Sequence, residues 1–318
     1  MRIAVMDDYQ DAFRSLSCYS KLKGHEVKII RETAANENAL VEALQGVEAV
    51  ILIQQRTAMP RSVIERLPAL KMISQTGRNT AHVDVAACKE RGIVVSAGGA
   101  GGPNATAEIA WALILSAARS IPTEVQALKE GRWQTALGTG LADKTLGVYA
   151  FGRIGSLVAT VGKAFGMKVV CWGREGSLGK AKAAGFDVAA SREAFFSQSD
   201  VVSLHLPLNK DTQGIVKAAD LALMKTDAIL VNTSRAGIIE AGALVAALEK
   251  GHPGRAGIDV YESEPVLHGD HPLLKMKNVV CTPHLGYVER GTYEVLYGTA
   301  TDQILAFAAG NPINVVGA

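Results

Sequence analysis

Short apolar runs alternate with amphipathic stretches along the first hundred residues of the chain. The apolar runs predict β-strands, and the stretches between them have the 3.6-residue period of α-helices. Such alternation is typical of a parallel sheet whose faces are covered by helices. We expect strands at 3–6, 26–30, 49–53, 71–74 and 93–95, and helices at 11–21, 37–44, 60–67 and 83–91.

A second alternating series runs from about 145 to 281. It follows a glycine-rich break at 97–103, where the backbone is free to hinge, and a long helix predicted from 104 to about 119. The tail, 289–308, is again helical in period, and its return onto the first sheet would make the first domain discontinuous. We therefore predict an α/β fold of two doubly wound parallel-sheet domains. Their bounds are 1–98 with 288–318 for the first domain and 99–287 for the second.

Composition limits the class of protein. At 318 residues the chain exceeds the size at which one hydrophobic core usually stops growing, which agrees with two domains. The net charge of +2 is too small to favour a nucleic-acid or anionic-membrane partner, and the most apolar segment, 109–118, is too short to span a bilayer. Four cysteines without paired spacing argue against a metal site and a disulfide framework. We expect a cytoplasmic protein that binds no metal.

The second series opens with a strand, a turn and a helix at 145–155 that approximate the dinucleotide fingerprint Gly-x-Gly-x-x-Gly. Ala150 stands at the first glycine position. Gly152 allows the backbone to approach a pyrophosphate, Gly155 allows the helix to pack closely on the strand, and the helix N-terminus faces the anion. On these residues alone, a tight turn without a ligand is the alternative.

The next predicted strand, 167–172, ends in Gly173-Arg174-Glu175. At this point NAD-binding folds carry an acid that binds the adenosine ribose hydroxyls. Gly173 removes the repulsion that such an acid would exert on a 2′-phosphate, and the Arg174 guanidinium suits a phosphate. We therefore predict NADP as the preferred cofactor over NAD. In the alternative, Arg174 is solvated and Glu175 binds the ribose.

Three reactive side chains, Arg235, Glu264 and His284, each come just after a short apolar run. If the runs are strands of one parallel sheet, the three side chains leave its carboxyl edge, where ligands bind in open α/β folds. Each residue alone has another interpretation: a surface salt bridge for the arginine, a solvated helix start for the glutamate and a surface loop for the histidine. The apolar runs are 228–231, 256–260 and 278–281.

These three side chains suit the reduction of a keto acid, which needs a hydride at the carbonyl carbon and a proton on its oxygen. An unperturbed imidazole has a pKa of ~6.5 and is mostly uncharged at neutral pH. A carboxylate within hydrogen-bond reach favours the imidazolium and orients it, which is the role we expect for Glu264 beside His284. The planar fork of Arg235 can hold a substrate carboxylate and polarise the adjacent carbonyl.

Six motifs spread along the chain carry a family resemblance: 77–79, 104–108, 203–208, 232–237, 259–265 and 282–286. On these motifs the chain resembles the D-isomer-specific 2-hydroxyacid dehydrogenases over almost its whole length. The resemblance implies a flavodoxin-like substrate-binding domain built from both ends of the chain, a Rossmann dinucleotide-binding domain, a cleft between them and a homodimer. It also implies an NAD(P)-dependent enzyme acting on small acids such as glyoxylate or hydroxypyruvate, with Arg235 binding substrate, His284 as acid/base and Glu264 as its partner.

The resemblance extends to further site residues. Asp259 is expected to accept a hydrogen bond from the nicotinamide carboxamide, and His205 is interpreted as a wall residue. Ala150, Gly173 and Asn79 depart from the pattern of many members. The predicted cofactor-binding residues are Thr106, Gly152, Arg153, Ile154, Gly155, Gly173, Arg174, Pro207, Thr212, Thr233, Asp259 and His284, and the predicted substrate-binding residues are Gly77, Arg78, Asn79, Arg235 and His284.

Two other functions stay open. A binding protein could use the same fold to sense the redox state of a dinucleotide, and relatives of that kind can keep the three reactive residues. An amino-acid or phosphite dehydrogenase on the same scaffold would differ in its oxidised product.

Overall fold

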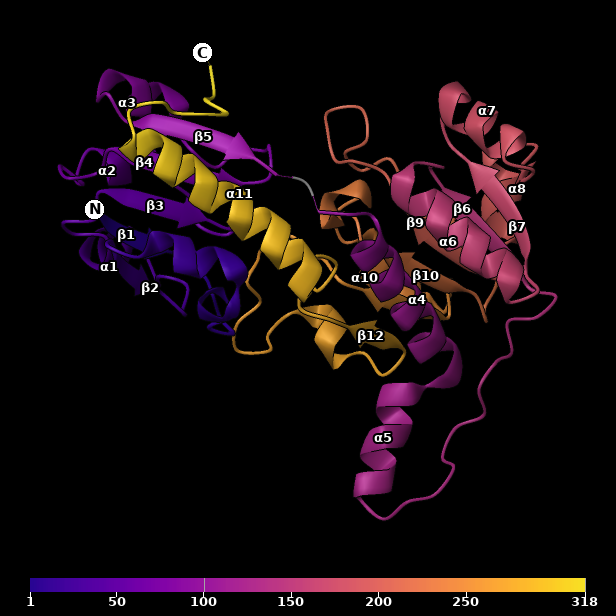
Figure 1. The fold of residues 1–318 in the computed structure, drawn as a ribbon. Helices are drawn as coiled ribbons and strands as arrows, with labels where there is room; N and C mark the ends of the chain where they lie inside the picture. The colour runs from indigo at the N-terminus through magenta and orange to yellow at the C-terminus, as the bar shows by residue number, and fades with distance from the viewer. Residues whose placement is uncertain (100, 318) are drawn as a thin grey trace. The chain divides into compact units, whose positions relative to one another are not determined.

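The computed structural model describes residues 1–99 and 101–317, which form two compact units. The first unit comprises Met1–Gly102 with Tyr287–Ala318, and the second comprises Pro103–Gly286 (Figure 1). Ala100, within the predicted glycine-rich break, lies outside the described residues. The expected domain bounds fall near these divisions, and the role of each unit stays a prediction.

The first unit has a five-stranded, fully parallel sheet in the order β2-β1-β3-β4-β5. This is the flavodoxin-like strand order, with its switch point between β1 and β3. The predicted alternation is confirmed here. The strands are β1 (Arg2–Val5), β2 (Glu26–Ile29), β3 (Ala49–Leu52), β4 (Met72–Thr76) and β5 (Val94–Gly98).

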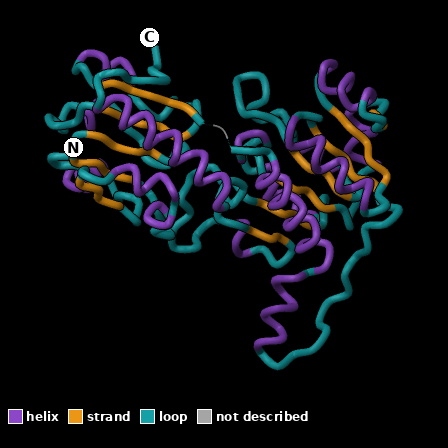
Figure 2. Tube along the Cα trace, viewed as in Figure 1, coloured by secondary structure: helices purple, strands orange, loops and turns teal. Residues whose placement is uncertain are grey.

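Helices cover both faces of this sheet (Figure 2). Successive side chains of a strand point to opposite faces, so Ala4 packs toward one helical layer while Ile3 and Val5 pack toward the other. The long α11 (Arg290–Ala308) belongs to the second layer, so the end of the chain completes the core of its beginning. The helices of the first layer are α1 (Glu37–Ala43), α2 (Arg61–Ile64) and α3 (Val85–Glu90).

The prediction of an α-helix at 11–21 is wrong. The segment forms two 3₁₀ helices, η1 (Phe13–Ser15) and η2 (Ser17–Leu22), separated by Leu16 in an extended conformation. The buried Asp8 carboxylate accepts the N–H groups of Ala12 and Phe13 at 2.9 Å each. Asp8 thus binds amides at the start of the segment, which have no acceptor within a helix.

The second unit has a seven-stranded parallel sheet in the order β12-β11-β10-β9-β6-β7-β8. Numbered from its own first strand, this is the Rossmann order 3-2-1-4-5-6 with one strand added. The strands are β6 (Thr145–Tyr149), β7 (Lys168–Trp172), β8 (Asp187–Val188), β9 (Val201–Leu204), β10 (Ile229–Asn232), β11 (Arg255–Ile258) and β12 (Val279–Cys281).

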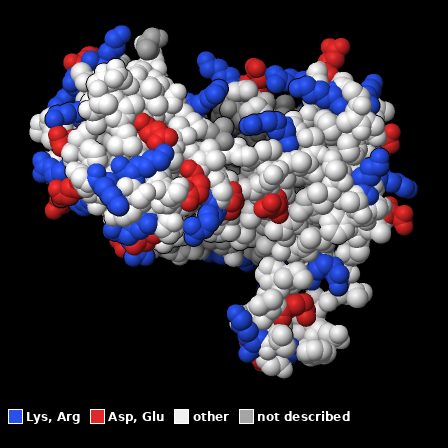
Figure 3. All heavy atoms as spheres, in the orientation of Figure 1, with Lys and Arg blue, Asp and Glu red and all other residues white. Residues whose placement is uncertain are grey.

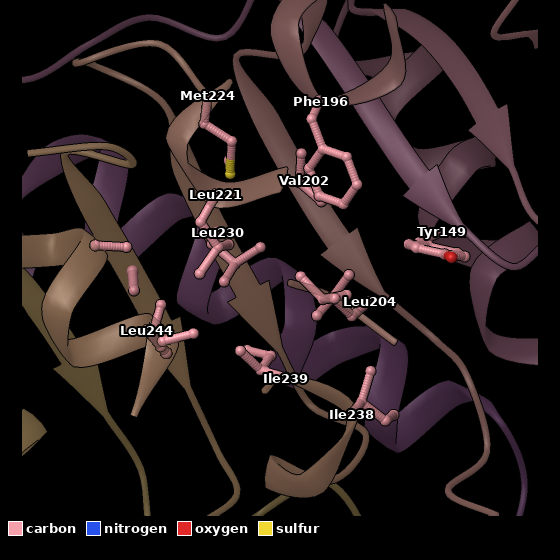
Figure 4. Close-up of a cluster of buried hydrophobic side chains, with 14 of the residues drawn as sticks. Tyr149, Phe196, Val202, Leu204, Leu221, Met224, Leu230, Ile238, Ile239 and Leu244 are labelled. Carbon is pink, nitrogen blue, oxygen red and sulfur yellow. The ribbon is translucent and has the colours of Figure 1, made fainter. Parts of the chain in front are cut away.

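Two hydrophobic clusters hold helices against the two faces of this sheet. Leu230 of β10 faces a cluster with Phe196, Leu221 and Leu244, drawn in Figure 4, while its neighbour Val231 faces the opposite cluster. Full burial of one such side chain contributes roughly 1.5–3 kcal/mol. No helix in the described part of the chain has the length and apolar character needed to cross a bilayer. The helices are α4 (Asn104–Arg119), α5 (Ile121–Lys129), α6 (Arg153–Ala164), α7 (Glu175–Ala183), α8 (Arg192–Gln198), α9 (Ala218–Ala222), η3 (Ala236–Ile238), α10 (Ala243–Lys250) and η4 (Pro272–Lys275).

Candidate active site

The three reactive side chains follow three neighbouring strands of the second sheet. Arg235 comes after β10, Glu264 after β11 and His284 after β12. β11 lies between β10 and β12, and all three strands are parallel. The three residues therefore leave the same, carboxyl edge of the sheet, where open α/β folds bind their ligands.

His284 and Glu264 are in direct contact. The Nδ1–H group of His284 donates to Oε2 of Glu264 over 2.5 Å. The other carboxylate oxygen accepts the backbone N–H of Tyr261 at 2.9 Å, so both oxygens of Glu264 have a protein donor. Because a carboxylate can only accept, the contact requires a hydrogen on Nδ1 and fixes the orientation of the ring.

Asp259, directly after β11, is fully buried and holds the loop that carries His284. Its Oδ1 accepts the Thr282 hydroxyl at 2.6 Å and the Leu285 N–H at 2.7 Å, and its Oδ2 accepts the Gly286 N–H at 2.9 Å. Burial raises the pKa of Asp259, against the opposing effect of these donors and of His284. From the sequence, Asp259 is predicted only to contact the cofactor. The sequence feature that could have indicated its role in holding the His284 loop is its position directly after an apolar strand.

The turn that presents Arg235 is fixed by side-chain hydrogen bonds. Asn232 Nδ2 donates to the Arg235 carbonyl and its Oδ1 accepts the Ser234 N–H, both at 3.0 Å. The Ser234 hydroxyl donates to the carbonyl of Leu204 on the adjacent strand at 2.8 Å. Among the described residues, no carboxylate lies within ion-pair distance of the Arg235 guanidinium, so the surface salt-bridge interpretation lacks a partner.

In the dinucleotide turn, Ala150 replaces the first glycine of the fingerprint but adopts a glycine-like backbone conformation. Ala150 has a φ of +75°, in the region that glycine adopts without strain. A Cβ on Gly155 would collide with the Ala150 carbonyl, whereas a Cβ on Gly152 would have nothing within 4 Å. Gly155 is therefore needed for packing, and Gly152 borders open space at the start of α6. Arg153 and Ile154 form the first turn of that helix.

The end of β7 places Arg174 in solvent. Gly173 has a φ of +153°, which side-chain-bearing residues rarely adopt, so this backbone suits glycine rather than an acid. Arg174 is the N-cap residue of α7, and its side chain is exposed. In the part of the chain that the structure describes, it pairs with no carboxylate.

Four other predicted cofactor residues lie in the second unit. Thr106 Oγ1 donates to the Gly286 carbonyl at 2.8 Å. Pro207 and Thr212 form one turn after β9, in which the threonine hydroxyl donates to the proline carbonyl at 2.5 Å. Thr233, directly after β10, has a buried hydroxyl with no hydrogen-bond partner among the described residues. A buried polar group without a partner is costly, which suggests that a ligand completes this position.

His205, which follows β9, has an uncharged ring. Its Nε2 lies 2.9 Å from the Ser203 hydroxyl, and its Nδ1 is buried without a partner in the described structure. Burial lowers the pKa of His205 to about 4. A neutral ring at working pH fits a wall residue better than a second acid/base.

The predicted substrate residues 77–79 lie in the first unit, directly after β4. The Gly77 N–H donates to the Gly98 carbonyl at 2.7 Å with a φ of +80°, and Asn79 Oδ1 accepts the Ala81 N–H at 3.0 Å. The Arg78 side chain is exposed and has no carboxylate partner among the described residues.

The chain is similar to known proteins in sequence and in fold. The family model "D-isomer specific 2-hydroxyacid dehydrogenase, NAD binding domain" matches residues 111–286. The glyoxylate reductase of Thermococcus litoralis is 33% identical over 305 residues, which cover 92% of this chain and 91% of that relative. The chain belongs to the D-isomer-specific 2-hydroxyacid dehydrogenase family.

Other members of the family are similarly close. The D-3-phosphoglycerate dehydrogenase of Archaeoglobus fulgidus is 34% identical, and the match covers 93% of this chain but only 55% of that relative. A solved structure of a phosphoglycerate oxidoreductase from Vibrio cholerae O395 is 42% identical with a TM-score of 0.93, covering 98% of this chain and 99% of that one. The family resemblance and the fold class predicted from the sequence are confirmed.

We predict that His205→Gln flattens the loss of stability in acid. Between its folded pKa of about 4 and the unperturbed value of ~6.5, the unfolded chain binds a proton that the folded chain rejects. The unfolding free energy therefore decreases as the pH is lowered through this window, by up to ~1.4 kcal/mol per pH unit for this proton. Urea titrations from pH 7 to 4 measure it by tryptophan fluorescence, because all three tryptophans lie in the second unit. An unchanged slope would contradict the prediction, and His268→Gln, at an exposed position, is the control.

Proposed function

We propose that the protein transfers a hydride between NAD(P)H and a small 2-keto acid, forming a D-2-hydroxy acid. The observation that carries this proposal is the His284–Glu264 hydrogen bond, at the ends of strands adjacent to the one that presents Arg235. The names of relatives, glyoxylate reductase among them, support substrates of the glyoxylate or hydroxypyruvate type.

His284 is the proposed acid/base. Glu264 holds Nδ1, so the ring exchanges its proton with the substrate oxygen through Nε2. The carboxylate stabilises the imidazolium before transfer and keeps the ring from rotating. Asp259 supports this arrangement by binding the backbone on the far side of His284 at Leu285 and Gly286.

Arg235 is the proposed ligand of the substrate carboxylate. Its guanidinium has no acidic partner among the described residues, and its backbone carbonyl accepts from Asn232, which also binds the Ser234 N–H. A fixed, planar cation of this kind binds a carboxylate through two parallel hydrogen bonds. Gly77, Arg78 and Asn79 remain the proposed substrate-binding residues of the first unit.

The residues around the turn fit a dinucleotide. A Cβ on Gly152 would have no protein atom within 4 Å, so the turn borders open space. The N-terminal N–H groups of α6 point toward this space. The Thr233 hydroxyl lacks a protein partner among the described residues. When bound, the reduced nicotinamide supplies the hydride. Arg174, next to Gly173, is exposed and pairs with no carboxylate of the described residues, which supports NADP as the preferred cofactor, with NAD as the alternative.

We expect His284→Ala to lower kcat by about 10²–10⁴-fold with little change in KM, because it removes the proton donor.

Arg235→Lys should mainly raise the KM for the keto acid, by about 10- to 100-fold, because the charge remains but the planar fork is lost. Steady-state kinetics with glyoxylate, hydroxypyruvate and phenylpyruvate measure both effects.

The matched control for the histidine is His271→Ala. His271 Nε2 contacts Glu262 at 3.0 Å, which gives a second histidine–carboxylate pair in the same unit without a proposed role. Its kcat should stay near that of the wild type. A His284→Ala enzyme with near-normal kcat would refute the acid/base role, and a wild type that binds the dinucleotide but turns over no keto acid would favour the redox-sensing alternative.

We predict a higher kcat/KM with NADPH than with NADH. Arg174→Ala should lower the NADPH value by about tenfold or more, since a hydrogen bond to a charged group contributes ~1.5–3 kcal/mol, and should leave the NADH value within about twofold. Lys182→Ala, near the other end of α7, is the control. A strong NADH preference in the wild type would overturn the prediction.

We also propose that the protein is a homodimer. α5 and the loop after it project from the sheet of their own unit in Figure 1, and Figure 3 shows uncharged atoms between the few charged groups there. This segment exposes large apolar side chains, and contiguous exposed apolar surface marks interaction sites. Their exposed fractions are Ile121 47%, Val125 48%, Leu128 59%, Trp133 75% and Leu137 96%.

In sedimentation velocity, the wild type should have twice the chain mass of 33.5 kDa. Leu137→Asp should shift it toward monomer, because a charge would be buried without a partner in the interface. Leu223→Asp, at an exposed leucine next to α9, should leave the mass unchanged. A wild type that sediments as a monomer at micromolar concentration would contradict the dimer.

A further inference from the structure

Arg56 lies between two tyrosine rings of the first unit, and one of them follows His284 closely in the chain. The Arg56 guanidinium carbon is 5.2 Å from the ring centroid of Tyr9 and 5.5 Å from that of Tyr287. Its Nε–H donates to the Tyr287 hydroxyl over 2.5 Å. Tyr287 is three residues beyond His284 and is the first residue of the returning part of the first unit.

The contacts of Arg56 are aromatic rather than ionic. Arg56 is half-buried in the loop after β3, and no carboxylate of the described residues lies within ion-pair distance of it. Burial raises the pKa of Tyr287, so its hydroxyl is neutral at working pH and accepts from Arg56. Attraction to the faces of the two rings stabilises the desolvated guanidinium, as a carboxylate partner would in an ion pair.

Both rings that enclose Arg56 are themselves anchored. The Tyr9 hydroxyl is 2.7 Å from the Thr33 hydroxyl, which donates to the buried Asp7 at 2.9 Å. The Tyr287 ring begins a row of aromatic contacts that leads into the core of the first unit. The successive ring centroids are 6.2 Å apart for Tyr287–Tyr293, 5.4 Å for Tyr293–Tyr297 and 5.1 Å for Tyr297–Phe13.

The residues just before Tyr287 are held from the second unit. Asp259 accepts the N–H groups of Leu285 and Gly286, and Thr106 donates to the Gly286 carbonyl. Each residue from 285 to 287 thus has a polar contact that restrains it. The segment directly after His284 is therefore restrained at three consecutive residues.

We infer that Arg56 is a positioning residue for His284. Its enclosure by Tyr9 and Tyr287 fixes the chain three residues beyond the imidazole, and so keeps the ring aligned with Glu264. The inference rests on the proposed acid/base role of His284. Misplacement of a reacting group by about 1 Å can cost about 100-fold in rate, so a contact that touches no substrate can control kcat.

The test compares Arg56→Ala, Tyr287→Phe and the double variant with the wild type. Each single variant should lower kcat by about tenfold or more while the KM for the keto acid stays within about twofold. The double variant should lose little more than the worse single variant, because both remove the same contact. Arg56→Lys should recover part of kcat, since it keeps the cation but loses the planar Nε–H.

Two controls remove similar groups elsewhere in the first unit. Arg61→Ala removes a cation that pairs with Glu90, and Tyr19→Phe removes a hydroxyl from the ring that packs on Phe13. Both should leave kcat unchanged. If Arg56→Ala raises KM while Tyr287→Phe has normal kinetics, Arg56 binds substrate directly and the inference is wrong.

Hydrogen–deuterium exchange of the peptide spanning 282–290 tests the restraint without any activity. The Leu285 and Gly286 amides should exchange faster in Arg56→Ala and Tyr287→Phe than in the wild type and the two controls. Unchanged exchange would overturn the inference even if activity fell. Faster exchange in a protein that turns over no keto acid would keep the restraint and refute the proposed function instead.

Discussion

The buried carboxylate of Asp259 is the constraint on which the candidate site depends. An ionised acid inside a protein is costly unless donors surround it, and here the donors are Thr282, Leu285 and Gly286, which flank His284 on both sides. Satisfying the acid therefore fixes the path of the loop. Glu264, held by the Tyr261 N–H, then needs only one further contact to orient the imidazole.

The second constraint is the parallel sheet, which turns distance along the chain into proximity at one edge. Strands β10, β11 and β12 are neighbours, so the residues that follow them emerge together at one edge. They do so although Glu264 comes 29 positions after Arg235 and His284 comes 20 positions after Glu264. β6 belongs to the same sheet, and the turn after it faces the same way. One sheet edge therefore carries both the candidate acid/base pair and the candidate dinucleotide turn.

The restraint of the chain continues past the loop that carries His284. Asp259 and Thr106 hold 285–286, and Arg56 holds Tyr287. The three contacts use different chemistry: a buried anion, a hydroxyl and a cation between aromatic faces. Asp259, Thr106 and Arg56 take no part in the proposed proton transfer, yet they restrain the segment that follows His284.

Much of this protein was determined by the sequence alone. The alternating apolar runs located the strands, because burial on both faces of a parallel sheet requires continuous apolar residues, and helix α4 ends where its pattern ends. Tertiary structure decided the rest. Ala150 adopts a φ of +75° because the turn requires it, although its own preference is otherwise. The segment 11–21 forms two 3₁₀ helices broken at the extended Leu16, with its first amides bound by the buried Asp8. Arg56 contacts Tyr287, which lies 231 residues further along the chain. Periodicity records which face a residue buries, but polar contacts between distant segments exist only once packing has brought them together.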